Sequence, residues 1–385
     1  MTARALRLLT FTSLFPGPGR PNHGVFVRNR LEHLVASQKV EAAVLAPMPH
    51  PPWALRDGES SCGAGVVLHP GFAHLRGLGQ WLAPLALRRA AMRALADPRL
   101  AQGRFDLIDA HYLYPDGVAA LALGRRLGIP VVVTARGSDV TQMPDHPWPR
   151  WQIRRVLREA AALIAVSGGL RDRLVELGAP AAKVTVLRNG VDLVRFRPTE
   201  RAAARTTWGL DGPTLLSVGG LIPRKRHHLT MAALALLPGW RLLIAGEGPE
   251  RRRLEAVAAA RGLGDRVRFL GPIPHADLAP LYTAADISVL ASEREGWANV
   301  LLESMACGTP VVASRIPGNP EVVAAPAAGR IVATNAPEDF AAAIRDLAAA
   351  TDRAATRAYA EDFSWDATSA GQMAVFRAVL AGKAA

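Results

Sequence analysis

The chain has 385 residues and a mass of 41.0 kDa, more than one hydrophobic core ordinarily supports, and this length predicts two domains of roughly 180 to 200 residues. Half of the residues are hydrophobic and 21% are charged, which excludes a disordered protein, and no apolar run reaches the roughly 18 residues that a membrane span needs. The net charge of +13 is uneven: residues 1–198 carry 26 Lys and Arg against 14 Asp and Glu, whereas residues 199–385 carry 20 against 19.

A basic first half indicates an anionic partner, which is nucleic acid, an acidic membrane surface or a phosphorylated substrate. The competing interpretation is an Arg-rich and Ala-rich composition imposed by a GC-rich genome. The sequence contains no aromatic-rich basic motif and no helix-turn-helix signature, so we expect no nucleic-acid partner. The two cysteines, Cys62 and Cys307, are too few for a disulfide framework and favour a reducing cytosol.

In chain order, short apolar runs alternate with helical stretches, and we read the N-terminal apolar run as a first strand rather than a signal peptide. The expected strands are Arg7–Thr12, Val40–Ala46, Leu107–Ala110, Val131–Ala135, Leu163–Val166, Val184–Leu187, Thr214–Val218, Arg241–Ala245, Val267–Leu270, Ile287–Leu290, Val311–Ala313 and Gly329–Val332. The expected helices are Val27–Ala36, Pro149–Ala162, Leu170–Leu177, His227–Leu237, Glu250–Arg261, Asn299–Ala306 and Glu338–Leu347.

This alternation predicts an α/β protein made of βαβ units, with parallel sheets buried on both faces. The pattern occurs twice, and a polar stretch from Asn189 to Pro213 separates the two series. We therefore expect domains over residues 1–197 and 198–365, with a C-terminal helix over about 366–385 packing back on the first. Ligands of doubly wound sheets bind at the carboxyl ends of the strands, which predicts a cleft between the domains.

The strongest motif is REGWANVLLESMACGTPVVAS at residues 294–314, where Glu295 falls in a strand-to-helix turn and Glu303 on the following helix. Carboxylates accept hydrogen bonds from vicinal hydroxyls of sugars and ribose. The backbone N–H groups at Trp297, Ala298, Asn299 and Val300 begin the helix and suit a phosphate. The alternative is an ordinary helix with an acidic first turn.

At this point the sequence resembles the retaining glycosyltransferases of family 4, which have the GT-B architecture of two facing Rossmann-like domains. The family's E-x7-E motif matches Glu295 through Glu303. Four further stretches match in the expected order: SLFPGPGRPNHGVFVRNR, SGGLRDRL with RNGVDLVRF, SVGGLIPRK, and IAGEGPE. The first of these and the run HYLYPDGVAA…TARGSDV look most like the branch that serves bacterial exopolysaccharide and cell-wall polymer synthesis.

The resemblance implies that Glu295 binds the donor sugar and Glu303 the nucleotide ribose. In SVGGLIPRKRHH, a strand ends at Gly219 and Gly220, and the cations Arg224 and Lys225 suit a departing diphosphate. Family members commonly have Arg after the first glycine and Gly after the lysine. Here Gly220 and Arg226 stand at those positions, so Arg224 is expected to replace the missing arginine. A solvated basic turn is the competing interpretation.

Two glycine-containing loops are further candidates for the donor. IAGEGPERRR lacks the third glycine of a dinucleotide fingerprint, and no acidic residue follows the next strand, so Gly246 and Gly248 are instead expected to let the backbone approach the nucleotide. The loop FPGPGRPNHGVF follows the first strand, and Gly24 is its expected helix-start position. An ordinary surface loop is the alternative for this segment.

His111 follows a strand at its carboxyl end, and the resemblance implies that it lies near the reaction centre. His23, Asp116, Arg136 and Asp139 occupy comparable loops and are candidates for the acceptor side. Structural roles in turns and caps compete with these assignments.

The sequence has no HExxH, no Cys/His cluster and no Asp-x-Asp metal site, so we expect neither a metal nor a cofactor. The segment QWLAPLALRRAAMRALA at residues 80–96 interleaves Trp81, Leu82, Leu85, Met92 and Leu95 with Arg88, Arg89 and Arg93. This basic amphipathic pattern suits an anionic bilayer surface, and a helix packed on the sheet is the alternative.

The sequence therefore predicts a cytoplasmic, metal-independent hexosyltransferase at the inner face of the membrane. It transfers a sugar from a nucleoside diphosphate-sugar to a glycan acceptor, expected to be lipid-linked, in polysaccharide or cell-envelope synthesis. A GT-B-type sugar-nucleotide epimerase and a non-catalytic sugar-binding protein are the alternatives.

Overall fold

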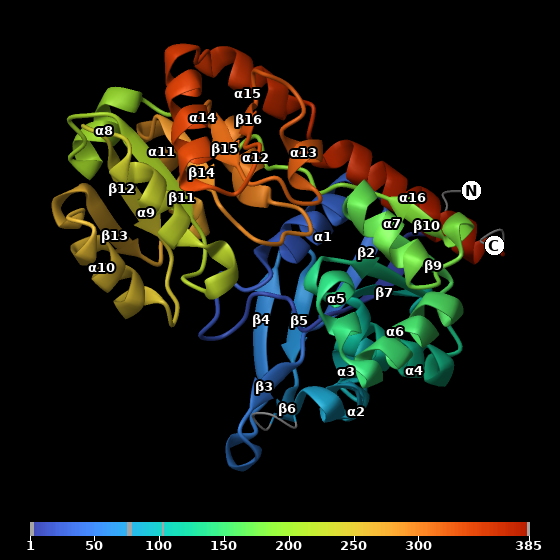
Figure 1. Ribbon diagram of the computed structural model, residues 1–385. Helices are drawn as coiled ribbons and strands as arrows, with labels where there is room; N and C mark the ends of the chain where they lie inside the picture. Colours follow the sequence, from blue (N-terminus) through green and yellow to red (C-terminus); the bar gives the residue numbers. More distant parts are fainter. Residues whose placement is uncertain (1–3, 75–78, 102–103, 383–385) are drawn as a thin grey trace. The chain divides into compact units, whose positions relative to one another are not determined.

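The computed structural model describes residues 4–74, 79–101 and 104–382 (Figure 1). The chain forms two compact units: unit 1 comprises residues 1–189 and 365–385, and unit 2 comprises residues 190–364. The sequence placed this division after residue 197. The expected helix over 366–385 runs from Trp365 to Leu380, and residues 383–385 lie outside the described part of the chain.

Unit 1 is an α/β layer structure. Its strands are β1 (Leu6–Phe11), β2 (Val40–Leu45), β3 (Met48–His50), β4 (Gly58–Cys62), β5 (Gly65–His69), β6 (Gly71–Ala73), β7 (Leu107–His111), β8 (Val131–Ala135), β9 (Ala162–Ala165) and β10 (Val184–Val186). Its helices are α1 (Val25–Ser37), α2 (Gly79–Ala94), α3 (Pro98–Ala101), α4 (Val118–Leu127), α5 (Ser138–Thr141), α6 (Pro147–Glu159), α7 (Gly168–Glu176) and α16 (Trp365–Leu380).

The main sheet of unit 1 has eight strands in the order β10-β9-β8-β7-β1-β2-β5-β4. All neighbours in it are parallel except β4 and β5. Every residue of β7, β8 and β9 is buried, as expected of strands covered by helices on both faces. The sequence did not predict β3 to β6. Strands β3 and β6 have only three residues each, and β4, GESSC, is mostly glycine and polar residues, whereas the short apolar run of β5, GVVLH, was missed.

Helix α16 packs on unit 1 although it is the last helix of the chain (Figure 1). Phe376 is fully buried and shares a core with Leu8 and Leu34. The hydroxyl of Thr368 donates to the carbonyl of Arg188 at 2.6 Å, so the helix is held by polar bonds as well as by apolar contact.

Unit 2 is a smaller doubly wound domain. Its strands are β11 (Thr214–Val218), β12 (Arg241–Ala245), β13 (Val267–Gly271), β14 (Ile287–Leu290), β15 (Val311–Ala313) and β16 (Gly329–Ile331). Its helices are α8 (Arg201–Trp208), α9 (His227–Ala235), α10 (Arg251–Ala260), α11 (Leu278–Ala284), α12 (Asn299–Ala306), α13 (Asn319–Val322), α14 (Pro337–Ala349) and α15 (Arg353–Glu361). The six strands are parallel in the order β13-β12-β11-β14-β15-β16, and the expected α/β fold with two Rossmann-like domains is confirmed.

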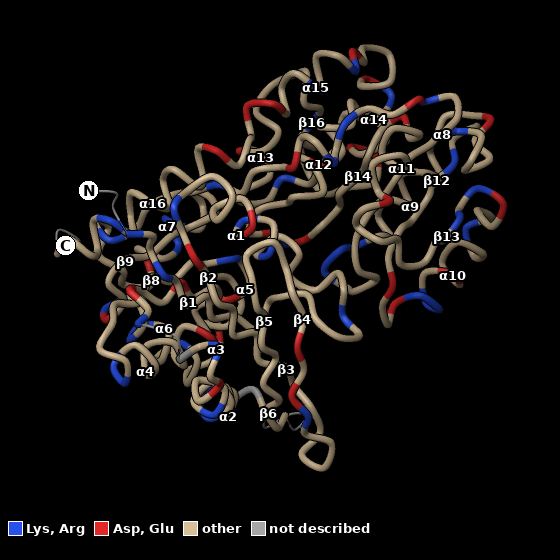
Figure 2. Tube along the Cα trace, turned by 180° about the vertical axis from the view of Figure 1, so that it is seen from behind, with Lys and Arg blue, Asp and Glu red and all other residues tan. Residues whose placement is uncertain are grey.

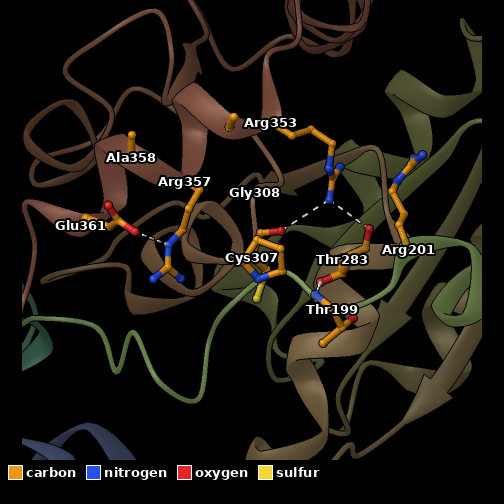
Figure 3. Close-up of a pocket in the computed structure, with 11 residues that line it drawn as sticks. Thr199, Arg201, Thr283, Cys307, Gly308, Arg353, Arg357, Ala358 and Glu361 are labelled. Atoms are coloured by element: carbon orange, nitrogen blue, oxygen red, sulfur yellow. Dashed lines mark hydrogen bonds and ion pairs between the residues drawn. The ribbon is translucent and has the colours of Figure 1, made fainter.

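A pocket of about 510 Å³ in unit 2 is lined by three arginines, but their guanidinium groups point in different directions (Figure 3). Arg353 donates to the carbonyls of Thr283 at 2.9 Å and Ala285 at 3.0 Å, at the end of α11. Arg357 donates to the carbonyl of Ala306 at 2.7 Å, at the end of α12. These cations satisfy helix C-terminal carbonyls, which gives them a structural role in holding two helices.

The order of the strands locates one crevice in each unit. In unit 1 the chain winds outward in opposite directions from β1 and β7, and in unit 2 from β11 and β14. The loops after these strand pairs diverge from each other, so ligands of doubly wound sheets bind there. The candidate residues in unit 1 are therefore those that follow β1 and β7, and the candidate residues in unit 2 are those that follow β11 and β14.

Candidate functional site

In unit 2 the loops after β11 and β14 are joined by an ion pair. Lys225 Nζ lies 2.7 Å from Glu295 Oε1, and Arg224 Nη1 lies 3.5 Å from Glu295 Oε2. Arg224 also donates to the carbonyl of Arg294 at 3.2 Å. Residues 70 positions apart thus form one cluster of two cations and one carboxylate at the strand switch point.

The Glu295 carboxylate is ionised at neutral pH. Burial by itself would raise its pKa, but Lys225 and then Arg224 outweigh burial and hold the pKa below its usual value. The two cations together carry more charge than this one carboxylate neutralises. The cluster is therefore suited to an anion such as a diphosphate.

The turn that presents these cations has a strained backbone. Arg226 has φ 51° and ψ 38°, a left-handed conformation that glycine adopts without penalty. This is the physical reason why glycine, which family members commonly have here, suits the position that Arg226 occupies in this chain. Behind the turn, His227 accepts from Ser217 Oγ through Nδ1 at 3.0 Å and donates to the Gly220 carbonyl through Nε2 at 3.3 Å. Burial lowers the pKa of His227 to about 4, so this neutral side chain fixes the loop.

Glu303 lies in a separate cluster on α12. One carboxylate oxygen is 3.0 Å from His275 Nε2 and the other accepts from the hydroxyl of Tyr282 at 3.0 Å. The Tyr282 ring is fully buried, and burial followed by the charge of Glu303 raises its pKa well above the ordinary value, so the hydroxyl keeps its proton. Each carboxylate oxygen retains a lone pair for a further hydroxyl donor, as a ribose would supply.

The remaining donor candidates lie at the same edge of unit 2. Gly246 has φ 148°, and a Cβ there would lie 2.0 Å from the carbonyl oxygen of Gly219, so only glycine allows the loops after β11 and β12 to touch. Gly248 similarly approaches the Leu221 carbonyl. At the start of α12 the side chains of Trp297 and Ala298 are buried, while Asn299 and Val300 are half-buried.

In unit 1 the loop after β1 leads into α1 through Gly24. Gly24 has φ 68° and precedes the first residue of the helix, and a Cβ there would lie 2.3 Å from the Leu14 carbonyl oxygen. His23 Nε2 is 3.1 Å from the carbonyl of Ser13, and burial followed by the charge of Arg20 lowers its pKa. The expected helix start at Gly24 is therefore enforced by close packing within the loop itself.

Two buried carboxylates hold the loops of unit 1 together. Asp116 accepts from the backbone N–H and, at 3.0 Å, from the hydroxyl of Ser13, and so ties the loop after β7 to the loop after β1. Asp139 accepts from the N–H groups of Leu113 at 2.8 Å and Gly137 at 2.7 Å. Both side chains are fully buried, which assigns them to the organisation of the loops.

His111 is the last residue of β7, and its side chain is 1% exposed. Arg136 Nη2 is 2.7 Å from His111 Nδ1, and His111 Nε2 is 3.4 Å from Asp109 Oδ2. Burial lowers the pKa of His111 to about 4, although Asp109 partly opposes the shift. Both ring nitrogens therefore face protein groups, and of the two bonded side chains Arg136, at 8% exposed, is the more accessible to a ligand.

The sequence singled out the candidate residues of unit 2 and those of unit 1, but it did not predict the neighbouring side chains that orient them. His275 and Tyr282 at Glu303, His227 at the β11 loop, and Asp109 at His111 were missed. His275 and Tyr282 carried no signal because they meet Glu303 from 28 and 21 residues away. His227 and Asp109 lie close in sequence to their partners, but neither belongs to a recognisable motif, and only the fold shows that their side chains turn towards the loop after β11 and towards His111. Within the described ranges, no group of three or more His, Cys, Asp or Glu side chains is arranged to hold a metal ion.

Comparison with known proteins decides the family. The family described as Glycosyltransferase Family 4 matches residues 23–195, and Glycosyl transferases group 1 matches residues 199–362. A D-inositol 3-phosphate glycosyltransferase of Segniliparus rotundus is 35% identical over 308 residues, which are 73% of this chain and 68% of the relative. The chain belongs to glycosyltransferase family 4. The enzyme of the same name from Mycobacterium marinum is 30% identical over an alignment that covers 97% of this chain and 85% of the relative.

Solved structures share the fold of this family 4 glycosyltransferase. Sucrose-phosphate synthase from Thermosynechococcus elongatus has a TM-score of 0.80 at 24% identity, covering 98% of this chain and all of the other. Anabaena HepE in complex with UDP and glucose has a TM-score of 0.77 at 20% identity, covering 97% of this chain and all of the other. The expected enzyme class is confirmed, and family membership favours glycosyl transfer over the epimerase and non-catalytic alternatives.

The buried carboxyl of Asp116 makes the stability of the enzyme depend on pH. Burial raises its pKa to about 7, although the two bonds from Ser13 oppose the shift. In the folded state this group keeps its proton up to about pH 7, whereas in the unfolded chain it ionises near pH 4, so its contribution to stability falls across that interval. We expect the free energy of unfolding of the wild type, minus that of Asp116→Asn, to decrease between pH 5 and 8 in urea titrations. Asp172→Asn, which changes an exposed carboxylate, is the matched control, and equal pH profiles for both variants would contradict the assignment.

Proposed function

We propose that this family 4 enzyme is a retaining glycosyltransferase that transfers a hexose-type sugar from a nucleoside diphosphate-sugar to an acceptor hydroxyl, without a metal ion. The observation that carries the proposal is the cluster of Arg224, Lys225 and Glu295 at the switch point of unit 2. A leaving nucleoside diphosphate gains negative charge as the glycosidic bond breaks, and two adjacent cations stabilise that charge.

In this proposal the donor lies along unit 2. Lys225 and Arg224 bind the diphosphate, Glu295 accepts from sugar hydroxyls, and Glu303 accepts from the ribose. Gly246 and Gly248 let the loop after β12 pack against Gly219 and Leu221 of the loop after β11, so that the two loops together, with Gly220, border the nucleotide. The N–H groups of residues 297–300 face its phosphates. The acceptor lies at the corresponding edge of unit 1, near His23, Gly24, His111 and Arg136, with Asp116 and Asp139 shaping its loops.

Two observations support different acceptors. The relatives are named D-inositol 3-phosphate glycosyltransferases, which favours a small phosphorylated polyol as the acceptor. The basic first half of the chain, with 26 Lys and Arg against 14 Asp and Glu in residues 1–198, is also compatible with a lipid-linked glycan at an anionic membrane surface. We place the phosphorylated polyol first, because it rests on relatives that share about a third of their residues with this chain.

A donor and acceptor panel tests this function. UDP-, GDP- and ADP-sugars are each incubated with D-inositol 3-phosphate, with free inositol, and with a lipid-linked oligosaccharide in detergent. We expect release of nucleoside diphosphate that depends on the acceptor, together with a product whose new bond keeps the anomeric configuration of the donor by NMR. Turnover of the lipid-linked glycan alone would select the second acceptor. A sugar nucleotide that is isomerised without any acceptor would overturn the transferase proposal in favour of an epimerase.

Lys225→Met tests the role of the cation cluster. Losing a charged hydrogen bond to the leaving group removes roughly 1.5 to 3 kcal/mol, so we expect kcat to fall about ten- to a hundred-fold, and by more than donor affinity changes. Arg226→Met removes the neighbouring cation without touching the ion pair with Glu295 and is the matched control. A kcat for Lys225→Met within twofold of that of Arg226→Met would remove Lys225 from the diphosphate site.

If the acceptor is lipid-linked, we also propose that the enzyme attaches peripherally to the membrane surface. Helix α2 leaves Leu82 and Leu85 57% and 42% exposed, whereas Trp81, Met92 and Leu95 are half-buried, so the apolar face is narrower than the sequence suggested. Trp81 packs edge-on against His146, the residue before α6, and Trp148 and Trp151 at the start of α6 are stacked and about half exposed. Tryptophan beside arginine is typical of surfaces that contact the membrane interface.

In Figure 2 the blue segments of α2 and α6 mark their arginines, and Arg88 and Arg89 of α2 are exposed. No helix in the described part of the chain is long and apolar enough to cross a bilayer. We therefore expect the enzyme to sediment with anionic but not with neutral liposomes, and less so in high salt. Arg88→Gln with Arg89→Gln, or Trp148→Ala with Trp151→Ala, is expected to reduce sedimentation severalfold. Equal sedimentation with both lipid types, or none, would leave the soluble acceptor as the proposal.

A further inference from the structure

Beneath the carboxyl edge of unit 1, six buried side chains form a closed ring of polar contacts. None of them is more than 9% exposed, and they come from α1, β7, the loop after β8, the segment after β10, and α16. In order around the ring they are Arg30, Gln372, Asp109, His111, Arg136 and Asn189.

The ring fixes the protonation of His111. A guanidinium group has only donors, so the bond of 2.7 Å from Arg136 Nη2 requires His111 Nδ1 to be the acceptor. The proton of the neutral imidazole then sits on Nε2, which faces Asp109 Oδ2 at 3.4 Å. His111 therefore presents an acceptor to Arg136 only in this tautomer.

Gln372 both donates and accepts along the ring between two charged neighbours, Arg30 and Asp109. Its Oε1 accepts from Arg30 Nε at 2.8 Å, and its Nε2 donates to Asp109 Oδ2 at 2.9 Å. Arg30 can only donate and an ionised Asp109 can only accept, so the amide cannot be reversed. A carboxamide of this length is thus the side chain that fits between them.

The amide also separates two opposite charges. Arg30 and Asp109 are both 1% exposed, and such a pair in a buried site attracts strongly when nothing lies between the groups. Asp109 Oδ1 and Arg30 Nη2 are buried and have no hydrogen-bond partner within the described residues, so each has an unused atom for a direct bond. Without the amide, a direct Arg30–Asp109 pair would draw the carboxylate away from His111.

We propose that Gln372 of α16 is a positioning residue, which holds Asp109 against His111 and thereby orients Arg136 at the acceptor edge of unit 1. Gln372 touches no substrate in this proposal, and it acts through Asp109, His111 and Arg136 in turn. The catalytic consequence rests on the proposed function, whereas the effect on His111 does not. The last helix of the chain would in this way supply part of the support for residues that lie more than 230 positions earlier in the sequence.

The experiment measures the ring nitrogens of His111 by 15N NMR in protein labelled on histidine, with His111→Gln identifying the signals. In the wild type we expect an unprotonated Nδ1 and a protonated Nε2. Gln372→Leu removes both bonds of the amide, and we expect it to shift the Nε2 resonance. We also expect kcat to fall roughly tenfold, with the donor Kd within twofold, because a misplaced group costs turnover while the donor residues lie in unit 2.

The matched control is Thr368→Val, which removes a part-buried hydrogen bond from α16 to the Arg188 carbonyl and leaves the ring intact. This control should keep the wild-type His111 signals and kcat. If Gln372→Leu does not fold, Gln372→Glu keeps the size of the side chain and its bond to Arg30 but cannot donate to Asp109 when ionised. Wild-type His111 resonances in either folded variant, or shifted resonances with a kcat within twofold of Thr368→Val, would overturn the positioning role. If the wild type transfers no sugar, the proposed function fails, and the resonances alone decide whether Gln372 sets the state of His111.

Discussion

All strands of a parallel sheet end at the same edge, and the position of the candidate site depends on this constraint. Where the chain reverses its winding direction, two neighbouring loops separate and leave space beside the backbone. Unit 1 reverses between β1 and β7, and unit 2 between β11 and β14. Lys225 and Glu295 flank the second of these points and form an ion pair across it, although 70 residues separate them.

Loops at such an edge lack the hydrogen bonds of the sheet, and buried side chains replace them. Asp116 binds the backbone of Ser13, Asp139 binds the backbone N–H groups of two loops, and His227 binds the Gly220 carbonyl. Each of these side chains is buried and hydrogen-bonded to the backbone, so we assign it to holding the loops rather than to the reaction. In unit 2, Arg224 and Lys225 are partly exposed and pair with a single carboxylate, Glu295, which leaves an excess of positive charge, and this is why we assign the chemistry there.

Much of the fold could be predicted from the sequence. The strands Val131–Ala135 and Thr214–Val218 have the bounds that the sequence predicted, because short, mostly apolar segments rich in Val, Leu and Thr suit strands covered on both faces. The strand Gly58–Cys62 was missed, since GESSC lies at the sheet edge where one neighbour suffices and polar residues are tolerated. Helix α2 was foreseen, but which of its apolar residues are exposed depends on Trp81 packing against His146.

The sequence by itself determined the fold class, the family and the chemical types available at the site, because these follow from periodicity and from motifs of short range. Glu295, Glu303, Arg224 and Lys225 were all recognisable in this way. Tertiary structure alone decided which groups meet: Glu303 with His275 and Tyr282, and His111 with Arg136. These partners come from separate strands and helices, and contact between them arises only when hydrophobic burial brings the elements together. A local sequence pattern does not predict which distant residues come into contact. The tautomer of His111 and the ionisation of Glu295 depend on such contacts.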